Sequence, residues 1–269
     1  MDHATHSHLL SGRVLLTGAT GGIGQAIASA FAARGASLLL SGRRVGVLEA
    51  LARELGGRAL VCDLAQREDV DRLRDQAGEV DVYVANAALP ASGALTDLTQ
   101  EEIDRMLEVN LRAPVALARA LAPGMVARGS GHMVFVSSLA GKTASPCSSL
   151  YSATKFGLRG FALGIREDLR RDGVGVSVVL PGFIRAAGMF ADAGVSLPRG
   201  VGTRSPQDVA AGVIRAIERD CAEIEVAPAM LRAGAAFGGL APALAAAVGR
   251  RMGGEKIAAD LAAGQTDKR

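Results

Sequence analysis

Short apolar runs alternate along the chain with longer segments in which apolar residues recur at helical spacing. Each run holds a few β-forming residues and ends at a turn residue. Because the runs lack an inside/outside alternation, they predict strands that are covered on both faces, as in a parallel sheet. The expected strands lie within 13–18, 37–42, 58–64, 80–87, 132–138, 176–182 and 223–228.

The segments between these runs predict helices, most of which end at a glycine. They span 22–35, 45–57, 67–78, 114–129 and 156–173. Regular alternation of strand and helix, without a repeat or an obvious linker, predicts one α/β domain. We expect a Rossmann-like doubly wound parallel sheet of about seven strands with helices on both faces.

The domain organisation follows from the segments outside this pattern. Residues 1–11 form a polar stretch that is expected to be a flexible leader, and 12–226 form the predicted dinucleotide-binding catalytic domain. Within that domain, the length and mixed polarity of 186–206 are typical of a lid over an active site. The apolar, alanine-rich extension 227–269 is predicted to be helical on both sides of Pro242. Three histidines in the leader could grip a metal, but a flexible polar leader explains them, and no metal site is assigned.

Composition excludes several classes of function. Of 269 residues, 49% are apolar and 21% charged, which suits a large core. A net charge of +3 without a dense basic run predicts no nucleic-acid partner. Three widely spaced cysteines are expected to be free thiols in a reducing compartment. The start does not resemble a signal peptide, and the apolar stretch 233–248 is short for a transmembrane segment. We therefore expect a cytoplasmic protein.

A glycine-rich turn follows the first predicted strand. The motif TGATGGIG places Gly18, Gly22 and Gly24 between that strand and the first helix. Glycines there allow a tight turn and a close approach of the backbone to a pyrophosphate, and the helix N-terminus adds amide donors. This context predicts dinucleotide binding.

The end of the second strand indicates which dinucleotide is bound. Gly42 stands where an NAD-binding protein usually has an acidic residue, and Arg43 and Arg44 follow it. A guanidinium matches a phosphate in charge and geometry, so we predict NADP(H) in preference to NAD(H). The alternative is a pair of solvated arginines at a helix start.

Tyr151 and Lys155 lie four residues apart, which places them on one face of a predicted helix. An ammonium about 5 Å from the phenol would favour phenolate by roughly 3 kcal/mol at an effective dielectric of about 20, which corresponds to about two pKa units. The pair is therefore a candidate acid/base. A surface lysine beside a packed tyrosine is the alternative.

Two further polar residues support the acid/base hypothesis. Ser138 ends the strand run HMVFVSS, at the sheet edge where ligands bind. Its hydroxyl could hold a substrate carbonyl near the phenol. Asn110 interrupts an apolar-periodic helix just before Pro114, which indicates either a functional position or a local kink.

From these residues the chain resembles the short-chain dehydrogenase/reductase family, in its compact branch. The resemblance extends from about residue 12 to 226. It is carried by TGATGGIG, Asp63, ANAA at 85–88, Asn110, Ser138, Tyr151, Lys155 and Pro181-Gly182.

The resemblance implies a role for each catalytic position. Tyr151 would exchange a proton with the substrate oxygen, and Lys155 would lower the phenol pKa and hold the nicotinamide ribose. Ser138 would orient the substrate oxygen, and Asn110 would fix a water in a proton relay. The expected cofactor-binding residues are Gly18, Thr20, Gly22, Ile23, Gly24, Arg43, Arg44, Asp63, Leu64, Asn86, Ala87, Tyr151, Lys155, Pro181, Gly182 and Ile184. A homodimer or homotetramer, joined through the helices 113–128 and 151–171, is also implied.

Two positions depart from the family pattern. ANAA lacks the first asparagine and the last glycine of the family's NNAG. Ala186 stands where the family often has a threonine that contacts the nicotinamide amide, so one hydrogen bond worth about 1 kcal/mol could be missing. Neither departure affects the four catalytic positions.

These observations predict an NADP(H)-dependent oxidoreductase that acts on a hydrophobic small-molecule carbonyl or secondary alcohol. A non-catalytic NADP(H)-binding redox sensor is the alternative, and dehydration or epimerisation on the same scaffold is a third. Substrate choice is expected to lie in 139–150, in 186–206 and in the tail after Val226. That tail could pack on its own domain or a partner subunit, wall the substrate pocket, or touch a membrane surface.

Overall fold

The computed structural model describes residues 8–90, 92–186, 202–251 and 254–265. Its centre is a seven-stranded sheet in the order β3-β2-β1-β4-β5-β6-β7. Every neighbouring pair of strands is parallel. The strands are β1 (Arg13–Thr17), β2 (Ser37–Gly42), β3 (Arg58–Val61), β4 (Val82–Ala85), β5 (Gly131–Val136), β6 (Val174–Pro181) and β7 (Glu223–Val226). The predicted doubly wound parallel sheet is confirmed.

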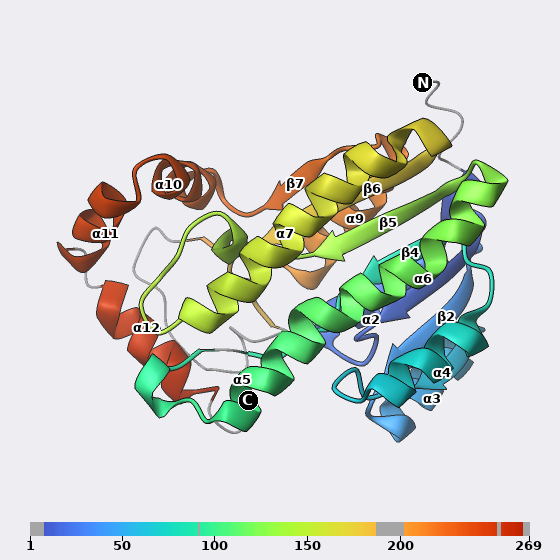
Figure 1. Ribbon diagram of the computed structural model, residues 1–269, viewed down its shortest axis with the longest axis horizontal. Helices are drawn as coiled ribbons and strands as arrows, with labels where there is room; N and C mark the ends of the chain where they lie inside the picture. The colour runs from blue at the N-terminus through green and yellow to red at the C-terminus, as the bar shows by residue number, and fades with distance from the viewer. Residues whose placement is uncertain (1–7, 91, 187–201, 252–253, 266–269) are drawn as a thin grey trace.

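Helices cover both faces of this sheet (Figure 1). One face carries α4 (Arg67–Ala77), α6 (Ala113–Arg128) and α7 (Ser149–Leu169). The other carries α2 (Gly22–Ala32), α3 (Val45–Glu54) and α9 (Pro206–Glu218). The five predicted helices are confirmed. Two more, α5 (Gln100–Leu107) and α9, were not predicted, although each begins at a capping box, Thr99 with Glu102 and Ser205 with Asp208.

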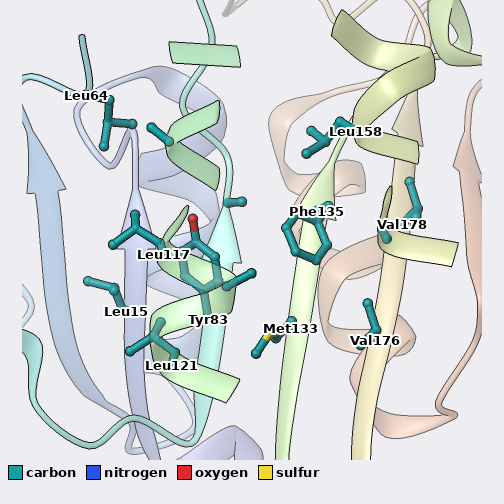
Figure 2. Packing of buried hydrophobic residues seen from close by; sticks show 14 of the residues in the cluster. Leu15, Leu64, Tyr83, Leu117, Leu121, Met133, Phe135, Leu158, Val176 and Val178 are labelled. Atoms are coloured by element: carbon teal, nitrogen blue, oxygen red, sulfur yellow. The ribbon is translucent and has the colours of Figure 1, made fainter. Parts of the chain in front are cut away.

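Aromatic packing fixes the two central strands that lead to the site. Figure 2 shows Tyr83 of β4 and Phe135 of β5 within the core on the α6 and α7 side. Their rings meet edge to face with centroids 6.1 Å apart, and Phe135 meets Phe161 of α7 in the same way at 5.7 Å. Such pairs contribute about 0.5–1.5 kcal/mol beyond the area that they bury. They hold β4, β5 and α7 together just below the ends of the strands.

The folded part of the chain begins earlier than expected. His8–Ser11 form a short 3-10 helix in which Leu9 and Leu10 are buried, 2% and 5% exposed. They pack in the core cluster on the α2 and α9 side. The expected flexible leader of residues 1–11 is therefore wrong for 8–11, because two leucines there bury apolar surface. Residues 1–7 lie outside the described part.

The C-terminal extension forms α10 (Ala229–Leu240), α11 (Pro242–Arg251) and α12 (Gly254–Ala263). This confirms helices on both sides of Pro242. Figure 1 shows the three helices at the end of the molecule toward which the strands point. Among the described residues, none of the helices is both long and apolar enough to span a bilayer. The expected lid 186–206 falls mostly on residues outside the described part.

Candidate active site

A cleft of about 1540 Å³ opens at the carboxyl ends of the strands. Doubly wound sheets bind ligands at this edge because the loops that leave the strands diverge there. The cleft is lined by Gly18, Thr20, Gly22, Ile23, Gly24, Arg43, Arg44, Asp63, Leu64, Asn86, Ala87, Ser138, Tyr151, Lys155, Pro181, Gly182 and Ile184. The fold thus brings every predicted site residue except Asn110 together in this cleft.

The glycine loop has no room for side chains at two positions. Gly18 has a φ of +68°, and a Cβ atom on it would lie 2.7 Å from the Cα of Ala87. A Cβ atom on Gly24 would lie 2.1 Å from the carbonyl oxygen of Gly18. The Asn86 side chain donates to that same carbonyl over 3.1 Å and so ties the loop to the end of β4. A bare backbone at the start of α2 fits the pyrophosphate of a dinucleotide.

Two arginines after β2 take different positions. Arg44 donates to the carbonyl oxygen of Thr20, and its Nε reaches the Thr20 hydroxyl over 3.4 Å. Arg43 is about half exposed at the cleft, with its Nη1 4.0 Å from Asp63 Oδ2. A Cβ atom on Gly42 would lie 3.0 Å from the Thr20 side chain. Arg44 therefore braces the glycine loop, while the Arg43 guanidinium remains accessible at the cleft.

The first two turns of α7 carry Tyr151 and Lys155. The Lys155 side chain is 2% exposed, and its Nζ donates to the Val136 carbonyl over 3.1 Å. Nζ lies 5.6 Å from the centre of the Tyr151 ring. The Ser137 hydroxyl donates to the Lys155 carbonyl over 2.9 Å, which fixes this turn of α7 against the end of β5.

Ser138 lies two residues past the end of β5. Its side chain interacts with the phenol of Tyr151 and acts to lower the pKa of that phenol. The Ser138 hydroxyl also accepts from the Ala140 amide over 3.1 Å and lies 3.4 Å from the Pro181 carbonyl. The serine hydroxyl is thus oriented by the backbone of two loops and faces the same cleft as Tyr151.

Burial controls the pKa values of the pair. Desolvation raises the pKa of Tyr151 to about 12, although its hydrogen bond with Ser138 acts in the opposite direction. Desolvation lowers the pKa of Lys155 to about 8. In the protein alone, burial and Ser138 are thus what shift the phenol pKa, and the lowering of this pKa by Lys155 stays a prediction.

Asn110 lies outside the cleft, in a π-helical turn (Glu108–Arg112) between α5 and α6. Its Oδ1 accepts from the Leu89 amide over 2.7 Å, and its Nδ2 donates to the Leu89 carbonyl over 3.0 Å. Nδ2 also lies 3.5 Å from the hydroxyl of Thr154, beside Lys155. The distortion foreseen at Asn110 is thus a π turn that joins the loop after β4 to the catalytic helix.

Sequence reasoning missed part of the cleft wall. Leu89, Pro90, Ser92, Arg105 and Val109 line the cleft, and no pattern in the sequence distinguishes them. The tail also contributes, through Met230, Leu231, Gly234, Ala235 and Gly238 of α10 and Ala243, Ala245, Ala246, Gly249 and Arg250 of α11. Of the three possibilities for the tail, walling the pocket and packing on its own domain are both observed.

Comparison with known proteins places this site in a family. The family model for short chain dehydrogenases matches residues 13–194. The ketoacyl reductase HetN of Nostoc sp. is 35% identical over 222 residues, which cover 79% of this chain and 77% of that protein. The chain belongs to the short-chain dehydrogenase family.

Solved structures agree with this assignment. A short-chain dehydrogenase from Sphingobium yanoikuyae in complex with NADPH superposes with a TM-score of 0.76 at 28% identity, covering 90% of this chain and 94% of that one. A metagenomic short-chain oxidoreductase in complex with NADP gives 0.68 at 32% identity, covering 81% and 97%. The chain is therefore an oxidoreductase-family protein with a nicotinamide-type cofactor cleft.

Proposed function

We propose that the protein is an NADP(H)-dependent oxidoreductase that interconverts a hydrophobic ketone or aldehyde and the corresponding alcohol. One observation carries the proposal: Ser138, Tyr151 and Lys155 line the same cleft as the glycine loop. A binding protein would need the loop, whereas a hydroxyl, a phenol and a buried ammonium at one place serve proton transfer.

Each side chain has a separate role in the reaction. When bound, the nicotinamide supplies or accepts a hydride. Tyr151 gives its phenolic proton to the substrate oxygen during reduction and takes it back during oxidation. The Ser138 hydroxyl holds that oxygen against the phenol, and the Lys155 ammonium stabilises the phenolate that remains. Asn110 supports Lys155 through the hydrogen-bonded contact between its amide and Thr154.

Three features support NADP(H) over NAD(H). Gly42 leaves no acidic group at the end of β2 to repel a 2′-phosphate. Arg43 presents an accessible guanidinium at the cleft. The relatives from Sphingobium yanoikuyae and from the metagenome bind NADPH and NADP.

Two experiments test this function. The protein is titrated with NADPH and with NADH while nicotinamide fluorescence is measured, and apolar ketones are then added. The proposal expects tighter binding of NADPH and loss of absorbance at the reduced-nicotinamide band once a ketone is added. Tight binding without turnover of any ketone, aldehyde or alcohol would favour the redox-sensor alternative instead. Binding of neither nucleotide would contradict both.

A homodimer or homotetramer through α6 and α7 remains part of the proposal. Phe156 on α7 is 42% exposed, and it leaves apolar surface on the helix that carries the acid/base pair. Light scattering coupled to size-exclusion chromatography, repeated with Phe156→Glu, tests it. A wild-type protein that runs as a monomer would contradict this assembly.

A further inference from the structure

The tail wall of the cleft is built from the smallest side chains. Apart from Met230, Leu231, Pro242 and Arg250, the cleft-lining positions on α10 and α11 are all glycine or alanine. The whole cleft, at about 1540 Å³, exceeds the roughly 300–1,000 Å³ of common ligand pockets. Short side chains leave this space open beside the helices, and their apolar character disfavours a charged occupant.

α10 runs outward from the chemical centre. A Cβ atom on Gly182 would lie 3.6 Å from Leu231 Cδ1 and 3.5 Å from Leu139 Cδ1, so α10 starts beside the loop that follows Ser138. Two turns later, a Cβ atom on Gly238 would lie 2.2 Å from the Thr143 hydroxyl. From Leu231 to Gly238 the helix rises about 10 Å. This sets the length of the wall that α10 offers.

Ion pairs hold this wall in place. Arg232 of α10 binds Glu225 of β7 over 2.8 Å. Lys142, in the loop after Ser138, binds the same carboxylate over 2.7 Å and reaches Glu223 over 3.1 Å. These carboxylates are mostly buried, so the pairs are screened less than those on an open surface. α10 and the loop after Ser138 are therefore held to the same strand, β7, and the position of α10 beside the cleft is fixed.

Gly234 lies on the cleft side of α10 between the two close contacts. Among the residues that the structure describes, a Cβ atom there would meet nothing within 4 Å, in contrast to Gly238. Gly249 of α11 also lines the cleft and also has open space at its Cβ position. A larger side chain at either glycine would extend into the cleft without a clash within the described protein.

We propose that the cleft continues past Ser138 and Tyr151 as an apolar channel between α10 and the loop 139–148, and that Gly234 sets its width. The channel takes an unbranched hydrocarbon arm of about 10 Å on the carbonyl substrate. The substrate class is accordingly a ketone or alcohol with a medium-length alkyl chain. This inference rests on the proposed function, since the reacting carbonyl is placed at Tyr151.

Gly234→Leu tests the channel, with Gly46→Leu as the matched control. Gly46 is also a helical glycine with open space at Cβ among the described residues, but it lies on α3 and does not line the cleft. With methyl ketones from butanone to dodecanone, Gly234→Leu should lower kcat/KM for the long ketones by about tenfold or more, and leave butanone and NADPH binding unchanged. Gly46→Leu should leave the whole series unchanged.

A second variant tests the channel in case Gly234→Leu does not fold. Gly249→Leu should lower kcat/KM only for the longest ketones, because α11 lies farther along the channel. If Gly234→Leu affects butanone and dodecanone equally while NADPH still binds, or changes neither, the channel is wrong.

Calorimetric binding of 2-dodecanol to the NADPH-loaded protein separates the channel from the reaction, because neither of these two reduced compounds can oxidise the other. The channel predicts saturable binding in the wild type and in Gly46→Leu, and about tenfold weaker binding in Gly234→Leu. That pattern without reduction of any ketone would uphold the channel and contradict the proposed function. Ketone reduction without a chain-length preference and without binding of 2-dodecanol would contradict the channel alone.

Discussion

The two sides of the cleft are built in opposite ways. On the strand side, the glycine loop is packed so closely that a Cβ atom on Gly24 would lie 2.1 Å from a backbone oxygen. On the tail side, a Cβ atom on Gly234 would meet no atom of the described residues within 4 Å. The strand side is therefore fixed by backbone geometry and suits one invariant ligand, whereas the tail side leaves space that different side chains could fill.

This difference separates cofactor binding from substrate choice. Backbone amides at the start of α2 recognise a phosphate through hydrogen bonds that any phosphate can accept. An apolar wall of glycine and alanine selects by volume alone. Changes on the strand side should therefore affect every substrate alike, and changes on the tail side should affect substrates according to their size.

The largest effect is expected at the point where the two sides meet. Tyr151→Phe removes the proton donor but keeps the ring that packs in the cleft. Turnover should fall about 10³-fold, while NADPH binding stays within about twofold of the wild type, since general acid–base catalysis contributes about 10²–10⁴-fold. Steady-state kinetics and fluorescence titration check both parts. Retention of more than a tenth of the wild-type rate would exclude Tyr151 as the acid/base.

Arg43→Ala should discriminate between the two nucleotides. Loss of a charged hydrogen bond to the 2′-phosphate should weaken NADPH binding by about 10–100-fold and leave NADH binding nearly unchanged. Arg44→Ala is the comparison, because Arg44 braces Thr20 and its loss should weaken both nucleotides. Equal losses for NADPH and NADH in Arg43→Ala would argue against a phosphate-reading role.

The same substitution on the two sides of the cleft should have opposite consequences. Gly24→Ala forces a methyl group against the Gly18 carbonyl and should lower the free energy of unfolding by about 1–3 kcal/mol. Gly234→Ala adds a methyl in open space within a helix and should raise it by up to about 1 kcal/mol. Urea denaturation of both variants measures the contrast. A lower free energy of unfolding for Gly234→Ala would show that the space beside Gly234 is already filled.

The last effect depends on pH. Lys155 is buried with a pKa lowered from 10.5 to about 8, so its burial opposes folding while it is charged. Between pH 8 and 10.5 the folded protein has lost this proton and the unfolded chain still holds it. The contribution of Lys155 to stability should therefore rise with pH, by up to about 1.4 kcal/mol per pH unit. Comparing urea denaturation of the wild type and Lys155→Met across this range isolates the effect, and parallel curves would contradict it.

Some features could be predicted because each depends on only a few adjacent residues. They are the strands, the glycine loop and the Tyr151–Lys155 spacing. Strand ends of a parallel sheet meet at one edge, so local motifs sufficed to bring Ser138 and the glycine loop together. The folded residues 8–11 were missed because two leucines in a polar stretch show no periodicity.

Features that depend on distant contacts could not be predicted. The pKa of Tyr151 is raised by burial, and that burial depends on segments far along the chain. The π turn at Asn110 reflects its bonds to Leu89, and the role of Gly234 depends on how the tail folds over the cleft. Glycines in an alanine-rich helix give no sign of which ones face a cavity.

The most direct test of the central claim is transfer of deuterium to an alkyl ketone from NADPH that carries deuterium at both C4 positions. After incubation with the wild-type protein, mass spectrometry should find an alcohol with one deuterium on the carbinol carbon, and Tyr151→Phe should form almost none. Alcohol without deuterium, or bound NADPH that is never oxidised by any ketone, would contradict hydride transfer in this cleft.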